Sequence, residues 1–418
     1  MPLRTAYIDF NSFFASVEQQ ERPELRGRAV GVAPLKAETT SLIAVSVEAK
    51  RRGLHMGVRV SEARAQCPDM VIVEARQELY VRYHHRLVAV IDTILPIAAI
   101  GSIDEVACAL PAGGDTPEAA RALALRTKQA IRANVGERLT CSIGIAPNPF
   151  LAKIASDLEK PDGLQIITDA DLPARLLPLA LRDLPGIGER METHLRSRGI
   201  HTVEQLWAQP RAVMAKLWGG IEGERMYARL RGEVVTLPET RTTSIGHGHV
   251  LPPELRHEAG AHATLHRLLQ KAAMRLRYSG FFAGGLHVAL RFRGRPNWSD
   301  ALTFFETQDT VLLTRTLNTL WARHPRSAAG DYLGVNITLF HLLPAAARTA
   351  PLGIVDTGDA RAPLHAAVDK LNRQLGKNSV VFGGALGATH YAPVRIAFGH
   401  IPDLALEAGG DEYADLQP

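Results

Sequence analysis

The order of apolar segments in the first 167 residues constrains the fold more than any other feature of the sequence. If the stretch 23–75, which Pro and Gly residues interrupt, is left out, the segments read strand, helix, strand, strand, helix, strand. This is the split βαβ order of a ferredoxin-like sheet, in which the first and third strands lie side by side. We therefore predict an α+β multidomain chain built around one antiparallel sheet.

Turn and capping residues set the expected limits of these elements. The first strand is expected at 3–10, and Ser12 is the expected N-cap of the helix after it. Asp115 is expected to open a second helix, with Pro117 in its first turn. The other expected features are a hairpin whose strands flank Gly101 and Ser102, a strand in "RLTCSIGIA", and a helix starting at Asn148 with Pro149 at its first position.

Three carboxylates fall at strand ends that this topology brings together. The first strand ends on Asp9, and the third begins at Asp104 and Glu105. Close carboxylates repel unless a positive group lies between them, and the usual partner is a hard divalent cation such as Mg²⁺. The structural alternatives are a helix N-terminal acid for Asp9 and a solvated turn for the other two. Both sites together, each within an apolar run, favour a two-metal centre for phosphoryl transfer.

Composition limits the class of protein. A chain of 418 residues with 46% hydrophobic content is expected to hold two to four domains at roughly 100–200 residues each. The stretch 241–340 carries twelve Lys and Arg against six Asp and Glu, which suits either a nucleic-acid-binding surface or a solvated helix face. Three cysteines without CxxC spacing and no apolar run of about eighteen residues predict a cytoplasmic protein without disulfides, a zinc site or a membrane contact.

Three motifs together resemble the Y-family of DNA polymerases, the low-fidelity enzymes that copy damaged templates. "DFNSFFASVEQ" resembles the first palm motif of that family, "SIDEVACAL" the second and "CSIGIAPNPFLAKIASDLEKPDG" the third, in the family's order and spacing. The resemblance spans about residues 4–345. It implies DNA-templated DNA synthesis from dNTPs on primer-template DNA, in translesion synthesis and the SOS response.

The resemblance also implies roles for individual residues. Two Mg²⁺ ions, which Mn²⁺ can replace, would be held by Asp9, Asp104, Glu105 and the carbonyl of Phe10. Phe14 takes the place of the steric gate that excludes a ribose 2′-hydroxyl, whereas Phe13 fits a core position better. The implied nucleotide-binding residues are Asn11, Ser12, Phe13, Phe14, Lys50, Arg51 and Lys153.

Four positions depart from the pattern of many family members. Asn11 stands where an Asp is common, although the polymerase V catalytic type has a similar Asp-x-Asn pattern. In the "VSVEAKRRG" stretch, Val47 replaces a frequent Tyr and Lys50 a frequent Arg. The Lys ammonium is a point charge and cannot bind a phosphate through two N–H groups as the Arg guanidinium does. Pro149 stands where a Lys is often found, which leaves one cation fewer near the triphosphate.

Two further segments indicate DNA contacts. "LRDLPGIGERMETHLRSRGI" is typical of a helix-hairpin-helix, in which Gly186 and Gly188 allow the backbone to approach a phosphate. The alternative is a plain helical hairpin. In "GLHVALRFRG", we expect Arg291, Arg293 and Arg295 to share one face of a strand and to contact the duplex backbone; an edge strand protected by charge is the alternative.

The domain organisation expected from the resemblance is a ferredoxin-like βαββαβ palm with small fingers, a helical thumb with a helix-hairpin-helix, and an α/β little finger. The expected ranges are palm 1–22 and 76–167, fingers 23–75, thumb 168–234, linker 235–245, little finger 246–346 and a C-terminal extension 347–418 without an assigned role. Family partners are the replication sliding clamp or mutasome proteins, but the C-terminal tail carries no convincing clamp-binding peptide.

Two rival functions remain at this stage. The first is a catalytically silent polymerase-like scaffold of a mutasome, which the departures at Val47 and Lys50 allow and the three retained acids oppose. The second is a nucleotidyl cyclase, which also places two metals on a ferredoxin-like sheet. The helix-hairpin-helix pattern and the basic stretch 241–340 have no use in a cyclase.

Overall fold

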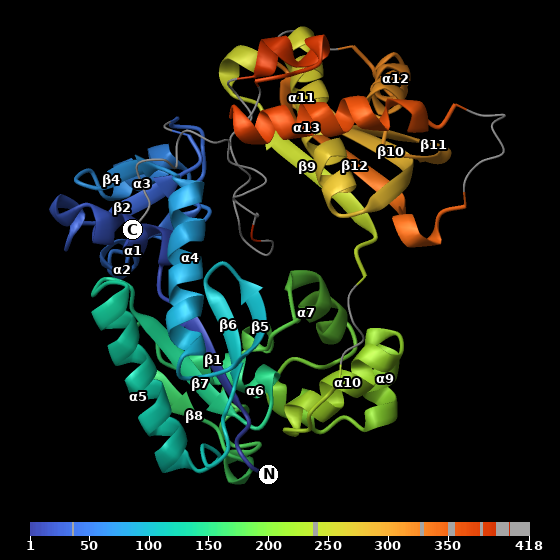
Figure 1. The fold of residues 1–418 in the computed structure, drawn as a ribbon. Helices are drawn as coiled ribbons and strands as arrows, with labels where there is room; N and C mark the ends of the chain where they lie inside the picture. The colour runs from blue at the N-terminus through green and yellow to red at the C-terminus, as the bar shows by residue number, and fades with distance from the viewer. Residues whose placement is uncertain are drawn as a thin grey trace. The chain divides into compact units, whose positions relative to one another are not determined.

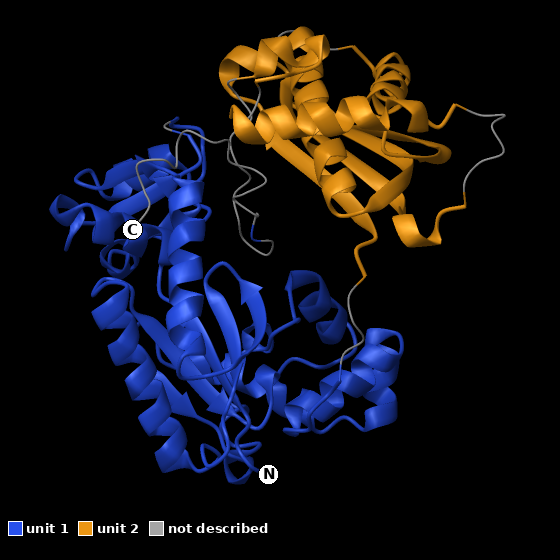
Figure 2. Ribbon diagram, viewed as in Figure 1, with its two compact units in different colours: residues 1–237, 396–401 blue, residues 238–395, 402–418 orange. Residues whose placement is uncertain are grey.

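The computed structural model describes residues 1–35, 37–236, 241–326, 330–349, 356–376, 379–389 and 401. The chain divides into two compact units, residues 1–237 with 396–401 and residues 238–395 with 402–418 (Figure 2). Each unit is described separately. In the described part of the chain, no helix has the combined length and apolar character that crossing a bilayer requires.

The first unit is built on a five-stranded sheet in the order β5-β6-β1-β7-β8. The expected adjacency of the first and third strands is confirmed, since β1 pairs antiparallel with β6 on one side and with β7 on the other. A fifth strand, β8, extends the sheet parallel to β7. The strands are β1 Thr5–Phe10, β5 Ile97–Ser102, β6 Glu105–Ala109, β7 Cys141–Ala146 and β8 Leu164–Ile166.

Helices flank this sheet on two sides. Two long amphipathic helices, α4 Gln77–Asp92 and α5 Pro117–Asn134, pack against each other (Figure 1). Helix α6 Pro149–Leu158 packs on β7 and β1. Its approach is unusually close, because a Cβ at Gly144 would lie 2.0 Å from the carbonyl oxygen of Ala152. Glycine at 144 therefore allows α6 to lie directly on the sheet.

The inserted segment forms its own small layer with a core of aliphatic side chains. Its sheet has the order β3-β2-β4, with two short helices beside it. The elements are η1 Pro23–Leu25, β2 Val30–Ala33, β3 Ala44–Val45, α2 Val47–Arg51, α3 Val60–Gln66 and β4 Val71–Glu74. Helix α1 Phe13–Glu21 contacts β2 and β3, so this layer is continuous with the main sheet.

A helical cluster completes the first unit. Its helices are α7 Glu189–Arg196, α8 Val203–Trp207, α9 Arg211–Trp218 and α10 Ile221–Leu230, and they share a hydrophobic core with α6. Two short turns, η2 Asp169–Asp171 and η3 Leu181–Asp183, precede them. The first helix expected in the helix-hairpin-helix is only the turn η3, because "LRDLPGIG" is too short before Pro185 for more than one turn.

The second unit is a four-stranded antiparallel sheet in the order β11-β10-β12-β9, with α11 and α12 on one face (Figure 1). Strand β9 includes Ser244 and Ile245, which the sequence placed in the linker; Ile245 packs into the core of this unit. The elements are β9 Ser244–Val250, η4 Pro253–Leu255, α11 Glu258–Tyr278, β10 Phe281–Phe292, β11 Trp298–Thr307, α12 Thr310–Trp321 and β12 Tyr332–Pro344.

Part of the expected C-terminal extension belongs to this second unit. After η5 Ala345–Ala347, which spans the expected boundary, the extension contains η6 Asp359–Arg361, α13 Ala362–Gln374 and η7 Gly383–Ala388. Arg277 on α11 donates through Nε and Nη2 to the carboxylate of Asp369 on α13, at 2.7 and 2.8 Å. His365 Nε2 lies 3.2 Å from Oδ1 of the buried Asp309, the N-cap of α12. These polar contacts hold α13 against the two helices of the sheet.

Local expectations about caps and turns were met only in part. Ser12 occupies the N-cap of α1 as predicted, but with φ 52° its side chain makes no cap hydrogen bond to any described residue. The hairpin turns at Ile103 and Asp104, so the prediction that its strands flank Gly101 and Ser102 was wrong, and both residues lie inside β5. Thr116, whose hydroxyl accepts from the backbone N–H of Ala119, caps α5 in place of Asp115.

Candidate active site

Asp9 and Glu105 lie directly opposite each other on the paired strands β1 and β6. Asp104 immediately precedes β6, and its carbonyl accepts a hydrogen bond from the backbone N–H of Phe10 at 2.9 Å. The topology therefore brings the three predicted acids together where β1 ends and β6 begins, which is the edge of the sheet formed by strand ends. Phe10 itself is buried, and its backbone lies at the same edge.

Two lysines lie among these acids. Lys153 Nζ on α6 lies 2.6 Å from Asp9 Oδ2 and 2.7 Å from Glu105 Oε1. Lys160 Nζ lies 2.7 Å from the same oxygen of Asp9. In this structure the positive charge that a carboxylate cluster requires comes from these ammonium groups, and among the described residues no group of three or more His, Cys, Asp or Glu side chains is arranged to hold a metal ion.

The acids differ in how well their charge is balanced. Burial alone would raise the pKa of Asp9, but the charges of Lys153 and Lys160 outweigh it and hold that pKa below its ordinary value. The pKa of Asp104 is raised by burial and by the charges of Asp9 and Glu105, against the hydrogen bond that Ser102 Oγ donates to it at 2.6 Å. The ionised form of Asp104 is therefore less well stabilised than that of Asp9, and a cation that prefers oxygen ligands would stabilise it.

Tyr7 lies two residues before Asp9 on the same face of β1, and its side chain contacts Glu105 on β6. Its hydroxyl donates to Glu105 Oε2 at 3.1 Å, and the ammonium of Lys153 lies 5.4 Å from the centre of its ring. Burial and the charge of Glu105 raise the pKa of Tyr7, so the phenol keeps its proton and remains a donor. Tyr7 thereby fixes the carboxylate of Glu105 in place.

Helix α6 directs Lys153 toward the acids because its first turn is firmly fixed. The side chain of Asn148 accepts from the backbone N–H of Leu151 at 2.8 Å, and Pro149 takes the first helical position, as predicted. Asn148 Nδ2 also donates to the carbonyls of Arg229 and Glu233, each at 2.9 Å. The helix is therefore tied to the end of α10 as well as to the sheet.

Asn11 supports the loop that carries Lys160. It is buried, and its Oδ1 accepts from the backbone N–H of Asp162 at 2.7 Å and from Thr140 Oγ1 at 3.3 Å. Its Nδ2 donates to Ser142 Oγ at 3.2 Å, a bond that an Asp at this position could not donate. The departure to Asn thus has a structural role behind the acids.

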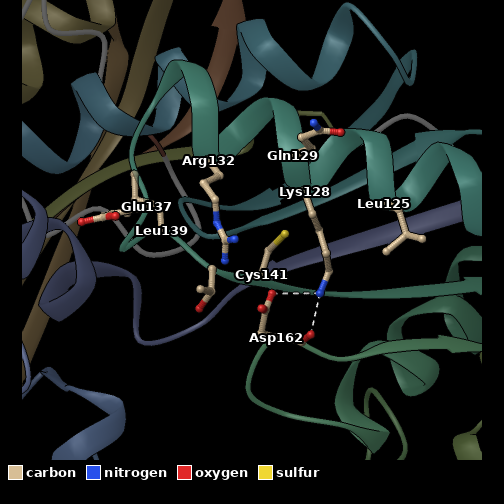
Figure 3. Close-up of a pocket in the computed structure, with 9 residues that line it drawn as sticks. Leu125, Lys128, Gln129, Arg132, Glu137, Leu139, Cys141 and Asp162 are labelled. Carbon is tan, nitrogen blue, oxygen red and sulfur yellow. Dashed lines mark hydrogen bonds and ion pairs between the residues drawn. The ribbon is translucent and has the colours of Figure 1, made fainter.

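A cavity of about 280 Å³ lies between α5 and the start of β7, and Asp162 of this loop lines it (Figure 3). From α5, Lys128 Nζ donates to the backbone carbonyl of Asp162 at 2.5 Å and to its Oδ1 at 2.9 Å. The thiol of Cys141 lies in the same cavity, and burial raises its pKa to about 12. Lys128 and Asn11 together fix the backbone at Asp162, two residues beyond Lys160.

Phe14 is buried and stacks on Tyr80 of α4, with ring centres 4.4 Å apart and planes 16° apart. The hydroxyl of Tyr80 donates to the fully buried Glu18 at 2.8 Å, and Arg76 donates to both oxygens of the same carboxylate. This network fixes the surface on which Phe14 rests. Phe13 is also buried, with its ring 5.8 Å from that of Phe14.

On α2, Lys50 is an exposed side chain near the acids. Partial loss of hydration and the charge of Lys160 lower its pKa, while the charges of Asp9 and Asp104 act in the opposite direction. The neighbouring Arg51 is exposed on the same short helix. The structure thus brings Lys50 into the electrostatic environment of the acids.

The structure places the five residues predicted to bind DNA in different surroundings. Gly186 has φ 88° and Gly188 is the N-cap of α7, and the space around each is open enough for another backbone to approach. Arg291 and Arg293 are exposed, but β10 ends at Phe292, so the three arginines do not share one strand face. Arg295 instead donates to the carbonyls of Pro325 and Arg326 and lies 3.7 Å from the centre of the Phe292 ring.

Comparisons with known proteins identify the family of the chain. Residues 8–157 match the impB/mucB/samB family, residues 242–352 its C-terminal domain, and residues 182–233 the DNA polymerase-iota thumb domain. The DNA polymerase IV of Moorella thermoacetica is 34% identical over 388 residues, which cover 89% of this chain and 93% of the relative. The chain belongs to the Y-family of DNA polymerases. A second relative, the DNA polymerase IV of Pelotomaculum thermopropionicum, is 29% identical with the same coverage of both chains.

Solved Y-family structures have the same fold. A chimera of the Y-family polymerases Dbh and Dpo4 gives a TM-score of 0.69, and an insertion ternary complex of Dbh DNA polymerase gives 0.55. Each is 21% identical to this Y-family chain, and each match covers 82% of this chain and 99% of the other. The α+β architecture predicted from the sequence is therefore confirmed.

Three side chains at the site of this Y-family chain were not predicted from the sequence: Lys160, Tyr7 and Tyr80. A signal for Lys160 was present, because Leu164, Ile166 and Ile167 after Gly163 indicate a short strand, and that strand starts at the end of the sheet where β1 ends. A strand there returns the preceding loop, and Lys160 with it, to the acids. Tyr7 also had a signal, since it shares a strand face with Asp9 at a spacing of two residues.

Proposed function

We propose that this Y-family chain is a DNA-templated DNA polymerase of low fidelity that carries out translesion synthesis. The observation that carries the proposal is the pairing of Asp9 with Glu105 across β1 and β6, with Asp104 beside them and cationic side chains around them. The relatives named DNA polymerase IV support the same activity. A role in the SOS response and in damage-induced mutagenesis is part of the proposal.

The donor set suits Mg²⁺, because Asp9, Asp104 and Glu105 present only oxygen atoms and because a cation would stabilise the ionised form of Asp104. Asp9, Asp104, Glu105 and the carbonyl of Phe10 would hold these ions, for which Mn²⁺ can substitute. When bound, such ions lower the pKa of a primer 3′-hydroxyl and stabilise the charge on the transferring phosphate. In the reaction the 3′-oxygen bonds to the α-phosphorus of a dNTP, and the bond to pyrophosphate breaks.

The lysines at the site would bind the triphosphate. Lys153 and Lys160 now neutralise Asp9, and a divalent cation on that carboxylate would release both ammonium groups toward phosphate oxygens. Lys50, and Arg51 beside it on α2, would add positive charge from the inserted layer. Ser12 and Asn11, at the turn between β1 and α1, would place the backbone near the same phosphates.

Phe14 would act as the steric gate against ribonucleotides. Its ring stacks on Tyr80, whose hydroxyl is held by the buried Glu18, so the aromatic surface is fixed before a nucleotide binds. A ring that cannot move can exclude a ribose 2′-hydroxyl, because the tightly packed side chains around it leave no room to relieve the steric overlap. Phe13 would support this ring from the core.

The subdomain names follow from the same proposal. The five-stranded sheet would be the palm, the inserted layer the fingers, the helical cluster the thumb and the second unit the little finger. The backbone at Gly186 and Gly188 would contact DNA phosphates, and Arg291 and Arg293 would contact the duplex backbone. The sliding clamp or mutasome proteins would be partners in the cell.

Primer extension by the purified chain with Mg²⁺ and dNTPs tests the function. Four primed templates that differ in the next template base should each direct incorporation mainly of the complementary nucleotide. The Asp104→Ala, Glu105→Ala double variant is the control and should bind the same DNA without extending it. If the wild type also binds DNA without extension, the chain is a scaffold and the proposal fails.

A further inference from the structure

Three polar side chains that have no part in the proposed reaction converge between helices α11 and α12 of the second unit. His262 Nε2 and His266 Nε2 lie 3.1 Å apart, and each lies 3.1 Å from Asn318 Oδ1. The two histidines are four residues apart and so project from the same face of α11. Asn318 reaches them from α12.

Hydrogen bonding alone satisfies this triangle incompletely. A neutral imidazole has one ring N–H and one acceptor nitrogen, and an amide oxygen can only accept. If only one of the two Nε2 atoms carries a hydrogen, that hydrogen is shared between the other Nε2 and the amide oxygen of Asn318. If both Nε2 atoms carry a hydrogen, the two hydrogens point toward each other. Three atoms that can each present a lone pair to the same point are therefore close together.

The dimensions suit a metal ion. In an equilateral triangle with 3.1 Å sides, each corner lies about 1.8 Å from the centre. Bonds from zinc to imidazole nitrogen and to oxygen are about 2.0–2.2 Å long. An ion at this distance from all three atoms lies about 1 Å above their plane, which leaves its far side open to water.

Neighbouring groups fix the two imidazoles in this orientation. The ring of Trp321 stacks on His262, with centres 4.6 Å apart and planes 14° apart. His266 is 5% exposed, and Gly384 of η7 packs so closely that a Cβ there would lie 2.7 Å from His266 Nδ1. His262 is half-buried and Asn318 is exposed, so an ion can reach the open side from solvent.

We propose that His262, His266 and Asn318 form a binding site for a divalent transition-metal ion of the zinc type, which cross-links α11 and α12. Imidazole nitrogen favours Zn²⁺, Co²⁺ and Ni²⁺ over the hard ions Mg²⁺ and Ca²⁺. The site thus differs in chemistry from the acid cluster at Asp9, Asp104 and Glu105, which has only oxygen donors. Its role is structural, because it joins two helices that cover the same sheet.

Co²⁺ and Zn²⁺ binding to the untagged full-length chain tests the proposal, with several millimolar Mg²⁺ present to occupy the carboxylates. Titration followed by the visible absorption of Co²⁺, and competition by Zn²⁺, should show a nitrogen-coordinated ion at one per chain. His262→Ala should weaken this binding at least tenfold, because one of three ligands is lost. The exposed His201→Ala, in the first unit, is the matched control and should bind as the wild type does.

Asn318→Asp gives a second, opposite readout. A carboxylate at the same position keeps the oxygen donor and adds a negative charge, so the ion should bind about tenfold more tightly. A merely hydrogen-bonded histidine cluster would not produce this gain. The proposal is overturned if the wild type binds no such ion, or if both His262→Ala and Asn318→Asp bind it as the wild type does.

Discussion

The ammonium of Lys153 lies 2.6 Å from a carboxylate oxygen of Asp9, although 144 positions separate the two residues in the sequence. Lys160 contacts the same oxygen from the loop after α6. Asp9 therefore joins the edge of the sheet to two separate cationic side chains. Under the proposed function, both lysines would become available to a triphosphate when that carboxylate holds a metal ion.

Lys160→Ala should raise the KM for dNTP about tenfold and lower kcat less, because the variant loses one cation proposed to bind the triphosphate while the acids remain. Steady-state incorporation of one nucleotide measures both constants. The exposed Lys370→Ala, on α13, is the control and should match the wild type. An unchanged KM in Lys160→Ala would remove this lysine from the nucleotide site.

Phe14→Ala should increase incorporation of ribonucleotides relative to deoxyribonucleotides at least tenfold, since the variant loses the ring that we propose blocks the 2′-hydroxyl. The measurement is the ratio of kcat/KM for a matched rNTP and dNTP. Phe13→Ala is a matched control, because it removes an equally buried ring next to the gate. If both variants change the ratio equally, the effect comes from loosened packing and Phe14 is not the gate.

Replacing Arg291 and Arg293 together by Ala should weaken DNA binding and reduce the slope of log K against log salt by about 2, since each phosphate contact contributes about 0.9. Fluorescence anisotropy at several salt concentrations gives this slope. Arg295→Ala should leave the slope unchanged, because its guanidinium binds backbone carbonyls and the Phe292 ring. A slope that falls only in Arg295→Ala would reverse the assignment.

Asp104→Asn should stabilise the metal-free protein. Burial and the neighbouring acids raise the pKa of Asp104, so the folded state binds its proton more tightly than the unfolded chain does. The ionised carboxylate therefore destabilises the fold above that raised pKa, and this effect disappears as the pH falls below the unfolded pKa. The midpoint of thermal unfolding should rise by about 1–3 °C at pH 7.5 and differ little near pH 3.5. A lower midpoint at pH 7.5 would contradict this electrostatic account.

The sequence predicted the sheet and the acids because both depend on patterns that the chain order alone constrains. Strand ends that carry Asp9 and Glu105 must meet once the first and third strands pair, whatever the loops do. Asn148 and Pro149 likewise predicted the start of α6, because capping is a local interaction.

The features that were missed depend on tertiary contacts. A strand at 164–166 returns the loop of Lys160 to the acids, but Asn11 and Lys128 hold its backbone at Asp162, and neither contact is visible in a local pattern. Arg295 does not lie on the expected strand face, because its guanidinium donates to backbone carbonyls about thirty residues away in the sequence. Helix α13 packs on the second unit through Asp369 and His365. Their partners on α11 and at the N-cap of α12 cannot be identified from sequence alone.

Single-turnover incorporation of one correct dNTP by Glu105→Gln and by the wild type tests the central claim most directly. Gln keeps the shape of Glu105 and can still accept from Tyr7, but it lacks the negative charge that the proposed metal site needs. The rate should fall at least about 100-fold while DNA affinity stays within about twofold of the wild type. Equal rates for the two proteins would show that Glu105 is no part of the catalytic centre and would contradict a two-metal mechanism at this edge of the sheet.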